Sequence, residues 1–113
     1  MCMEFVKKEL EEINKKFSGS ILRGGSLEHA LSIQKHKKYG KYKKMAYIWR
    51  AILVDHPFTG GNKRTALWAA LKFTEGMGKK PDTNKLNRLI IKISTRNITS
   101  IAKIERMLRN AIG

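Results

Sequence analysis

The residues HPFTGGNKRT, which begin at His56, bring three kinds of chemical group together within nine positions. Gly60 and Gly61 can adopt backbone angles that turn successive amides inward, as in an anion-binding nest. Lys63 and Arg64 supply an ammonium and a bidentate guanidinium, both suited to phosphate oxygens. His56 can be neutral at cellular pH and can accept the proton of a hydroxyl nucleophile. Together these groups predict a polyphosphate site opposite a histidine base, and hence phosphoryl or nucleotidyl transfer to a hydroxyl.

The charge at the start of the following helix supports an anion at this place. The first turn of a helix carries partial positive charge and favours acidic residues, yet Lys63 and Arg64 stand there. A bound anion removes that conflict, and the free amides of the first turn would contribute donors to it. Asn62 can hydrogen-bond a phosphate or hold the loop by capping the helix. Plainer interpretations remain open, because His56 can be a helix-terminal cap and the two cations can be surface charges.

The elements that must position these groups are helices, because apolar residues recur at steps of three and four along nearly the whole chain. We predict an all-α, compact bundle of five to six helices, with a short flap or hairpin near residues 18–25. Ser26 is the expected N-cap of a short helix, and Asn97 or Thr99 that of the last one. The predicted helices cover residues 3–17, 26–33, 42–55, 63–75, 86–93 and 101–111. The helices at 42–55 and 63–75 are apolar on most sides, so the HPFTGGNKRT loop would join two central helices.

Size and composition fit one globular domain spanning residues 1–113. Hydrophobic residues make up 42% of the chain, and no apolar run approaches the ~20 residues that span a bilayer. Cys2 is the sole cysteine and the N-terminus lacks the pattern of a signal peptide, so we expect a cytoplasmic protein without membrane association. The net charge of +15 predicts acidic partners, nucleic acid first among them, or else a solvated lysine-rich surface.

The motif resembles the signature of a known family. Residues 56–66, HPFTGGNKRTA, are similar at every position but one to the Fic/Doc signature, roughly His-x-Phe-x-acid-Gly-Asn-(Gly or Lys)-Arg. The stretches from Gly19 to Arg23 and from Leu27 to Leu31 look like that family's flap and the short helix after it. The resemblance covers about residues 20–110.

This resemblance implies an activity and a role for each motif residue. Fic proteins move AMP from ATP onto protein hydroxyls, whereas the Doc branch binds the nucleotide the other way round and transfers a phosphate. The Doc branch has lysine in the Asn-Lys-Arg segment, so Lys63 favours a Doc-like phosphate transfer, with Fic-type AMP transfer as the alternative. His56 would be the general base and ATP, or another nucleoside triphosphate, the co-substrate. The implied phosphate-binding residues are Gly60, Gly61, Asn62, Lys63 and Arg64.

The same resemblance implies partners. The flap, at Ile21, Leu22 and Arg23, would align a protein substrate as an added strand. Family members of this size often act as toxins that a separate antitoxin inhibits. Some relatives carry their own inhibitory helix, with Ser or Thr four residues before Glu, and no such pair occurs here. Inhibition would therefore come from another protein.

One departure from the signature bears on activity. The family's acid, which holds Mg²⁺ on the phosphates, corresponds to Gly60, and a bridging metal normally needs one or two carboxylates. Asp55 is close in sequence but is expected to face elsewhere. Mg²⁺ could still bind weakly through water and phosphate, or the cationic loop could replace it. The third outcome is a catalytically impaired basic module that binds phosphate or nucleic acid.

Two further patterns suggest other functions. Lysines interleave with Tyr39 and Tyr42 in residues 35–44, which suits either single-stranded nucleic acid or a solvated segment whose tyrosines pack on the core. Arg50 and His56 have a spacing found in some all-helical RNases, but that function leaves Gly-Gly-Asn-Lys-Arg unexplained. His29 and His36 lack partners at metal-ligand spacing, so we predict no zinc site.

Overall fold

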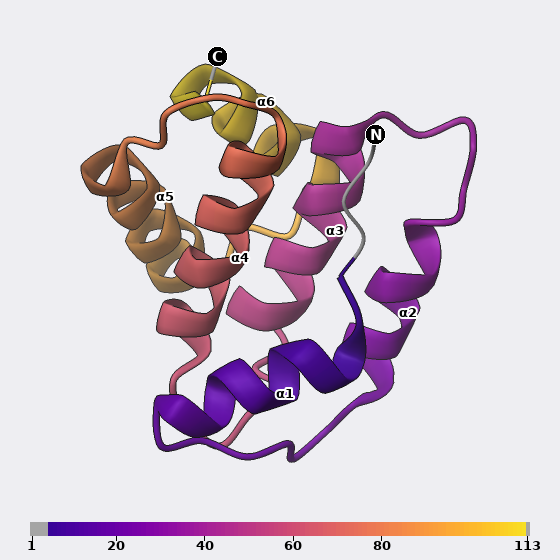
Figure 1. The fold of residues 1–113 in the computed structure, drawn as a ribbon, viewed down its shortest axis with the longest axis vertical. Coiled ribbons are helices and arrows are strands. Elements are labelled where there is room, and N and C mark those ends of the chain that lie inside the picture. The colour runs from indigo at the N-terminus through magenta and orange to yellow at the C-terminus, as the bar shows by residue number, and fades with distance from the viewer. Residues whose placement is uncertain (1–4, 113) are drawn as a thin grey trace.

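Six helices make up the part of the chain that the computed structural model describes, residues 5–112 (Figure 1). The prediction of an all-α bundle is confirmed, and no strand forms in these residues beyond one isolated bridge. Met3, placed in the first predicted helix, lies outside the described residues. None of the described helices combines the length and apolarity needed to cross a bilayer. The helices are α1 (Lys7–Lys16), α2 (Gly25–Ile33), α3 (Lys41–Leu53), α4 (Asn62–Gly76), α5 (Thr83–Arg96) and α6 (Ile101–Ile112).

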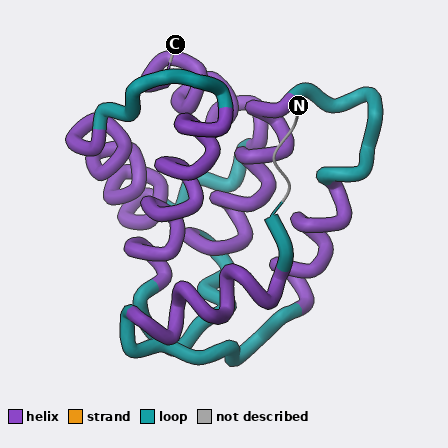
Figure 2. The backbone as a smooth tube through the Cα atoms, in the orientation of Figure 1, coloured by secondary structure: helices purple, strands orange, loops and turns teal. Residues whose placement is uncertain are grey.

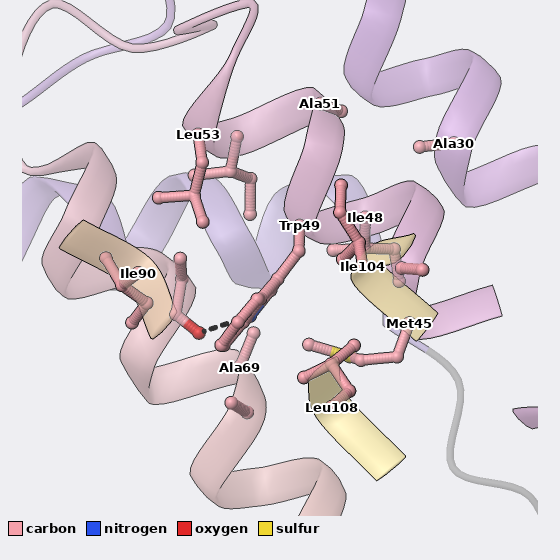
Figure 3. Packing of buried hydrophobic residues seen from close by; sticks show 14 of the residues in the cluster. Ala30, Met45, Ile48, Trp49, Ala51, Leu53, Ala69, Ile90, Ile104 and Leu108 are labelled. Atoms are coloured by element: carbon pink, nitrogen blue, oxygen red, sulfur yellow. Dashed lines mark hydrogen bonds between the residues drawn. The ribbon is translucent and has the colours of Figure 1, made fainter. Parts of the chain in front are cut away.

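Helix α3 is the centre of the bundle and packs against α2, α4, α5 and α6. Its apolar residues are buried on most faces, as the sequence predicted. The indole Nε1 of Trp49, which is 0% exposed, donates to the carbonyl oxygen of Ala66 in α4 at 3.0 Å. This bond ties the two helices together one turn inside the loop that connects them. Figure 3 shows α3 side chains directed toward the neighbouring helices, with Met45, Ile48 and Trp49 close to Ala69, Ile104 and Leu108.

Two of the predicted helix caps are wrong. Helix α2 begins at Gly25 with Gly24 as its N-cap, because the carbonyl oxygen of Gly24 already accepts from the Glu28 amide. Ser26 therefore lies inside the first turn. Asn97 closes α5 in a left-handed conformation, with φ 51°, which asparagine tolerates. The residue that caps α6 is Ser100, whose Oγ accepts from the Lys103 amide.

Helix α1 lies across one end of the bundle and is tied to two other helices by ion pairs. Lys72 of α4 pairs with Glu9, and Lys7 pairs with Glu28 of α2. The loop that follows α1 and the loop between α3 and α4 both run at this end of the molecule (Figure 2). The first of these loops contains the predicted flap, so the fold brings flap and motif side by side.

Candidate functional site

The loop between α3 and α4 turns at two residues with left-handed backbone angles. Helix α3 ends at Leu53, where the Val54 amide makes the last helical bond, and His56 follows with φ 48°. Positive φ is uncommon outside glycine, although histidine is among the residues that adopt it more often. Gly61 has φ 68° and is the N-cap of α4. The chain therefore reverses within a few residues, and the His56 side chain is exposed at its rim.

The interior of the loop is held by one carboxamide and one aromatic ring. Asn62 accepts from the Phe58 amide at 3.3 Å and donates from Nδ2 to the Phe58 carbonyl oxygen at 3.0 Å. The Phe58 ring is buried in the core, with 2% of its surface exposed. Of the two roles expected for Asn62, its carboxamide takes the one of holding the loop. It does so as the first residue of α4, while Gly61 occupies the cap position.

Five consecutive backbone amides, those of residues 60–64, donate to no acceptor among the described residues. The amides on either side are used, because Thr59 donates to the Ser20 carbonyl oxygen and Thr65 to that of Gly61. Free donors at a helix N-terminus that follows a left-handed glycine are the usual arrangement of an anion-binding nest. The loop thus has unused capacity for negatively charged oxygens.

His56 and residues 61–64 of this row border one hollow of about 360 Å³, which Gly60 does not line. Its lining residues are Phe17, His56, Gly61, Asn62, Lys63 and Arg64. Lys63 and Arg64 are exposed, and neither forms an ion pair within residues 5–112. The hollow combines a potential proton acceptor, two cations and a helix N-terminus, so its chemistry suits a polyphosphate next to a hydroxyl.

No carboxylate lines this hollow in the described part of the chain. Asp55 faces away from it, as expected, and borders a second hollow of about 260 Å³ with Tyr47 and Arg50. Gly60 has open space around it but brings no ligand, and no cluster of metal-binding side chains occurs in residues 5–112. The residues present therefore do not fit a Mg²⁺ ion held by the protein.

The predicted flap lies against the motif loop without lining the hollow. Ile21 forms an antiparallel bridge with Phe58. The amides of Leu22 and Arg23 donate to the Pro57 carbonyl oxygen at 2.7 and 3.0 Å. Within residues 18–25, the part from Ser20 to Arg23 pairs with the motif, whereas Gly25 already belongs to α2. The side chains of Ile21 and Leu22 are 38% and 61% exposed.

Two residues at the end of α1, which the sequence analysis did not single out, belong to the site. Phe17 forms one wall of the hollow. Asn14 is 0% exposed and donates to the carbonyl oxygen of Gly60. Its position between Leu10 and Phe17, at helical spacing, makes it a polar residue within an apolar stripe. A polar residue in this apolar stripe was the feature of the sequence that could have indicated a role for Asn14.

The residues of the other two sequence patterns, Arg50 and the tyrosines of residues 35–44, do not lie at this site. Arg50 lies over the Tyr47 ring at 5.2 Å and borders the second hollow, so it does not share a hollow with His56. Tyr42 is buried against Phe73, and Tyr39 stacks on His36 and on Tyr47. The tyrosines of residues 35–44 therefore pack on the protein itself.

Comparison with known families agrees with the geometry. The model of the Fic/DOC family matches residues 6–74, from the start of α1 to the last turn of α4. The chain belongs to the Fic/DOC family. The expected coverage was about residues 20–110, whereas the match begins earlier, at residue 6, and ends earlier, at residue 74. The match does not distinguish the Doc branch. A comparison with curated proteins found no match, and a comparison with solved structures found none either.

Proposed function

We propose that this protein is a Doc-like transferase that moves a phosphate from a nucleoside triphosphate to a protein hydroxyl. The observation that carries the proposal is the shared hollow, in which His56 borders a row of amides free of protein acceptors. Membership of the Fic/DOC family is consistent with a nucleotide-dependent transfer. Lys63, in the Asn-Lys-Arg segment, favours the Doc-like reaction over AMP transfer.

In the proposed reaction the substrate hydroxyl oxygen attacks the γ-phosphorus of ATP. The new O–P bond forms as the bond from the γ-phosphorus to the bridging oxygen breaks, so ADP leaves and the His56 imidazole takes the hydroxyl proton. Phosphoryl transfer depends mainly on positioning and on stabilising charge at the phosphate oxygens. The amides of residues 61–64, with the side chains of Lys63 and Arg64, would supply both.

The flap supports a protein as the acceptor. The edge of the flap that faces the motif is hydrogen-bonded to Pro57 and Thr59. On the opposite edge, the amide and carbonyl of Ile21 bond to no partner among the described residues. A strand edge with unpaired groups can add an extended peptide. The exposed side chains of Ile21 and Leu22 would contact such a peptide, and a separate antitoxin could use the same edge.

Among the described residues no carboxylate lines the hollow, which favours one second candidate, a binding module that holds a nucleotide or another polyphosphate without turnover. The positive charge of the chain would raise its association rate with any such anion. In this case Lys63 and Arg64 keep their role and His56 has none in chemistry.

A label-transfer assay separates these functions. The protein is incubated with cell lysate and either γ-labelled or α-labelled ATP, beside a His56→Ala control. Label on a protein from the γ position alone, lost in the control, is the expected result. Transfer from the α position would indicate AMP transfer instead. Binding of ATP with no transfer from either position would refute the enzyme and leave the binding module.

A further inference from the structure

We propose that Asn14 is a positioning residue that sets the orientation of the Gly60–Gly61 peptide and so aims the Gly61 amide at the bound phosphate. The identity of the ligand as a phosphate rests on the proposed function, whereas the effect of Asn14 on the loop does not. Nδ2 of Asn14 donates to the carbonyl oxygen of Gly60 at 2.7 Å and to Oγ1 of Thr65 at 3.1 Å. One buried amide group thereby holds the loop and the first turn of α4.

The geometry of the peptide bond links this contact to the hollow. In a trans peptide the C=O of Gly60 and the N–H of Gly61 point in opposite directions. Asn14 holds the Gly60 oxygen on the side of α1, so the Gly61 N–H is directed away from α1. Gly61 borders the hollow, and its amide has no acceptor in the described residues.

Glycine on both sides makes this peptide easy to rotate. Gly60 meets no atom within 4 Å of an added Cβ, so packing does not restrain it on its outer side. Without a donor at Asn14 the backbone angles of this peptide would offer little resistance to a flip, because glycine adopts both signs of φ. A flipped peptide would present the Gly60 carbonyl oxygen to the phosphate, and two negative groups would then face each other.

Backbone hydrogen bonds from the residues that follow α1 fix the position of Asn14. Its own carbonyl oxygen accepts from the amides of Phe17 and Gly19 at 2.9 and 3.1 Å. A Cβ on Gly19 would come within 2.3 Å of both Asn14 Oδ1 and the Gly60 carbonyl oxygen. The end of α1, the start of the flap and the turn are thus in contact with no space between them.

The Asn14 carboxamide carries an energetic penalty at this position, which indicates that its NH₂ donor has the role in holding the loop. Oδ1 of Asn14 is buried without a hydrogen-bond partner among the described residues. An unpaired buried acceptor destabilises the fold, and an apolar residue of similar size would avoid that penalty. The NH₂ group, which satisfies the Gly60 carbonyl, is the group that offsets it.

The test compares Asn14→Leu with Thr65→Val, since each removes one polar group from the same buried cluster and keeps the number and branching of the side-chain heavy atoms. Calorimetric titration with ATP, in the absence of any acceptor protein, should show about tenfold weaker binding for Asn14→Leu. Thr65→Val, which keeps the bond to Gly60, should bind within about twofold of the wild type. Equal affinity of Asn14→Leu and the wild type would overturn the inference.

Amide ¹⁵N relaxation of the ligand-free proteins decides the question without ATP. In Asn14→Leu the Gly61 and Asn62 order parameters should fall from about 0.85 toward 0.6, whereas residues in the middle of α4 stay rigid. Thr65→Val should retain a rigid Gly61. If Asn14→Leu does not fold, Asn14→Asp serves, because it keeps the size and replaces the donor with an acceptor. A wild type that fails to bind ATP refutes the transferase, while an unchanged loop in the variants refutes the role of Asn14.

Discussion

Gly61 should be far less tolerant of a side chain than its neighbour Gly60. Its φ of 68° lies in the left-handed region. A Cβ there would lie 2.8 Å from Cβ of Phe17 and 3.1 Å from the Phe17 carbonyl oxygen. Gly60, by contrast, has no atom within 4 Å of an added Cβ and no left-handed φ. Gly61→Ala and Gly60→Ala therefore form a matched pair in the same turn.

The expected cost follows from two separate effects. A left-handed conformation costs a non-glycine residue about 1–2 kcal/mol, and a forced contact of this kind adds about 1–3 kcal/mol. Gly61→Ala should thus lower the free energy of unfolding by about 2–5 kcal/mol, a large part of the roughly 5–15 kcal/mol of a typical domain. Gly60→Ala should cause no loss and can stabilise the protein by about 0.4–1 kcal/mol, since alanine restricts the unfolded chain.

Urea denaturation monitored by circular dichroism measures both values, with unchanged slopes showing that the transition itself is the same. The reasoning fails if Gly60→Ala destabilises as much as Gly61→Ala. It also fails if Gly61→Ala costs less than about 1 kcal/mol, because the turn would then not depend on the left-handed residue.

Three further outcomes are expected. Gly60→Asp places a carboxylate where the family signature has an acid. The variant should fold like the wild type and increase label transfer in Mg²⁺. If label transfer does not increase, a missing metal ligand does not limit activity. Asn62→Ala leaves the amide and carbonyl of Phe58 without their partner and should cost about 1–3 kcal/mol in urea denaturation, whereas a smaller loss would show that the loop holds itself. The hydrogen bond from Lys7 to Glu28 raises the pKa of Lys7 above its ordinary value of 10.5. Its stabilising effect is therefore complete below the unfolded-state pKa and disappears as the pH rises through the folded-state pKa, which lies above 10.5. The wild type and Lys7→Met should differ in stability at pH 8 and converge once the pH exceeds the folded-state pKa, and a difference that persists there would contradict this.

The parts of the fold that depend on local spacing were predictable. The apolar residues at steps of three and four indicated the helices, which were expected to number five to six. The helix caps were harder to predict from the sequence. Gly24 begins α2 through its backbone carbonyl alone, and a side-chain preference for Ser26 could not indicate that.

The parts of the site that depend on long-range contacts were not predictable from spacing. Asn14 meets Gly60 and Thr65, which are 46 and 51 residues away, and helical periodicity identifies a face without identifying its partner. The same holds for the flap, whose Ser and Gly residues indicated an irregular segment but not its pairing with Phe58. The motif itself was visible because His56 and Arg64 are only eight residues apart.

The proposed function requires the turn before α4 to bind phosphate opposite His56. The most direct measurement is a titration of the ¹⁵N-labelled wild type with ATP, followed by amide chemical shifts. We expect saturable shifts at the amides of residues 61–64 and at His56, with one common dissociation constant. Shifts confined to the lysine-rich residues 35–44, with residues 61–64 unmoved, would contradict it.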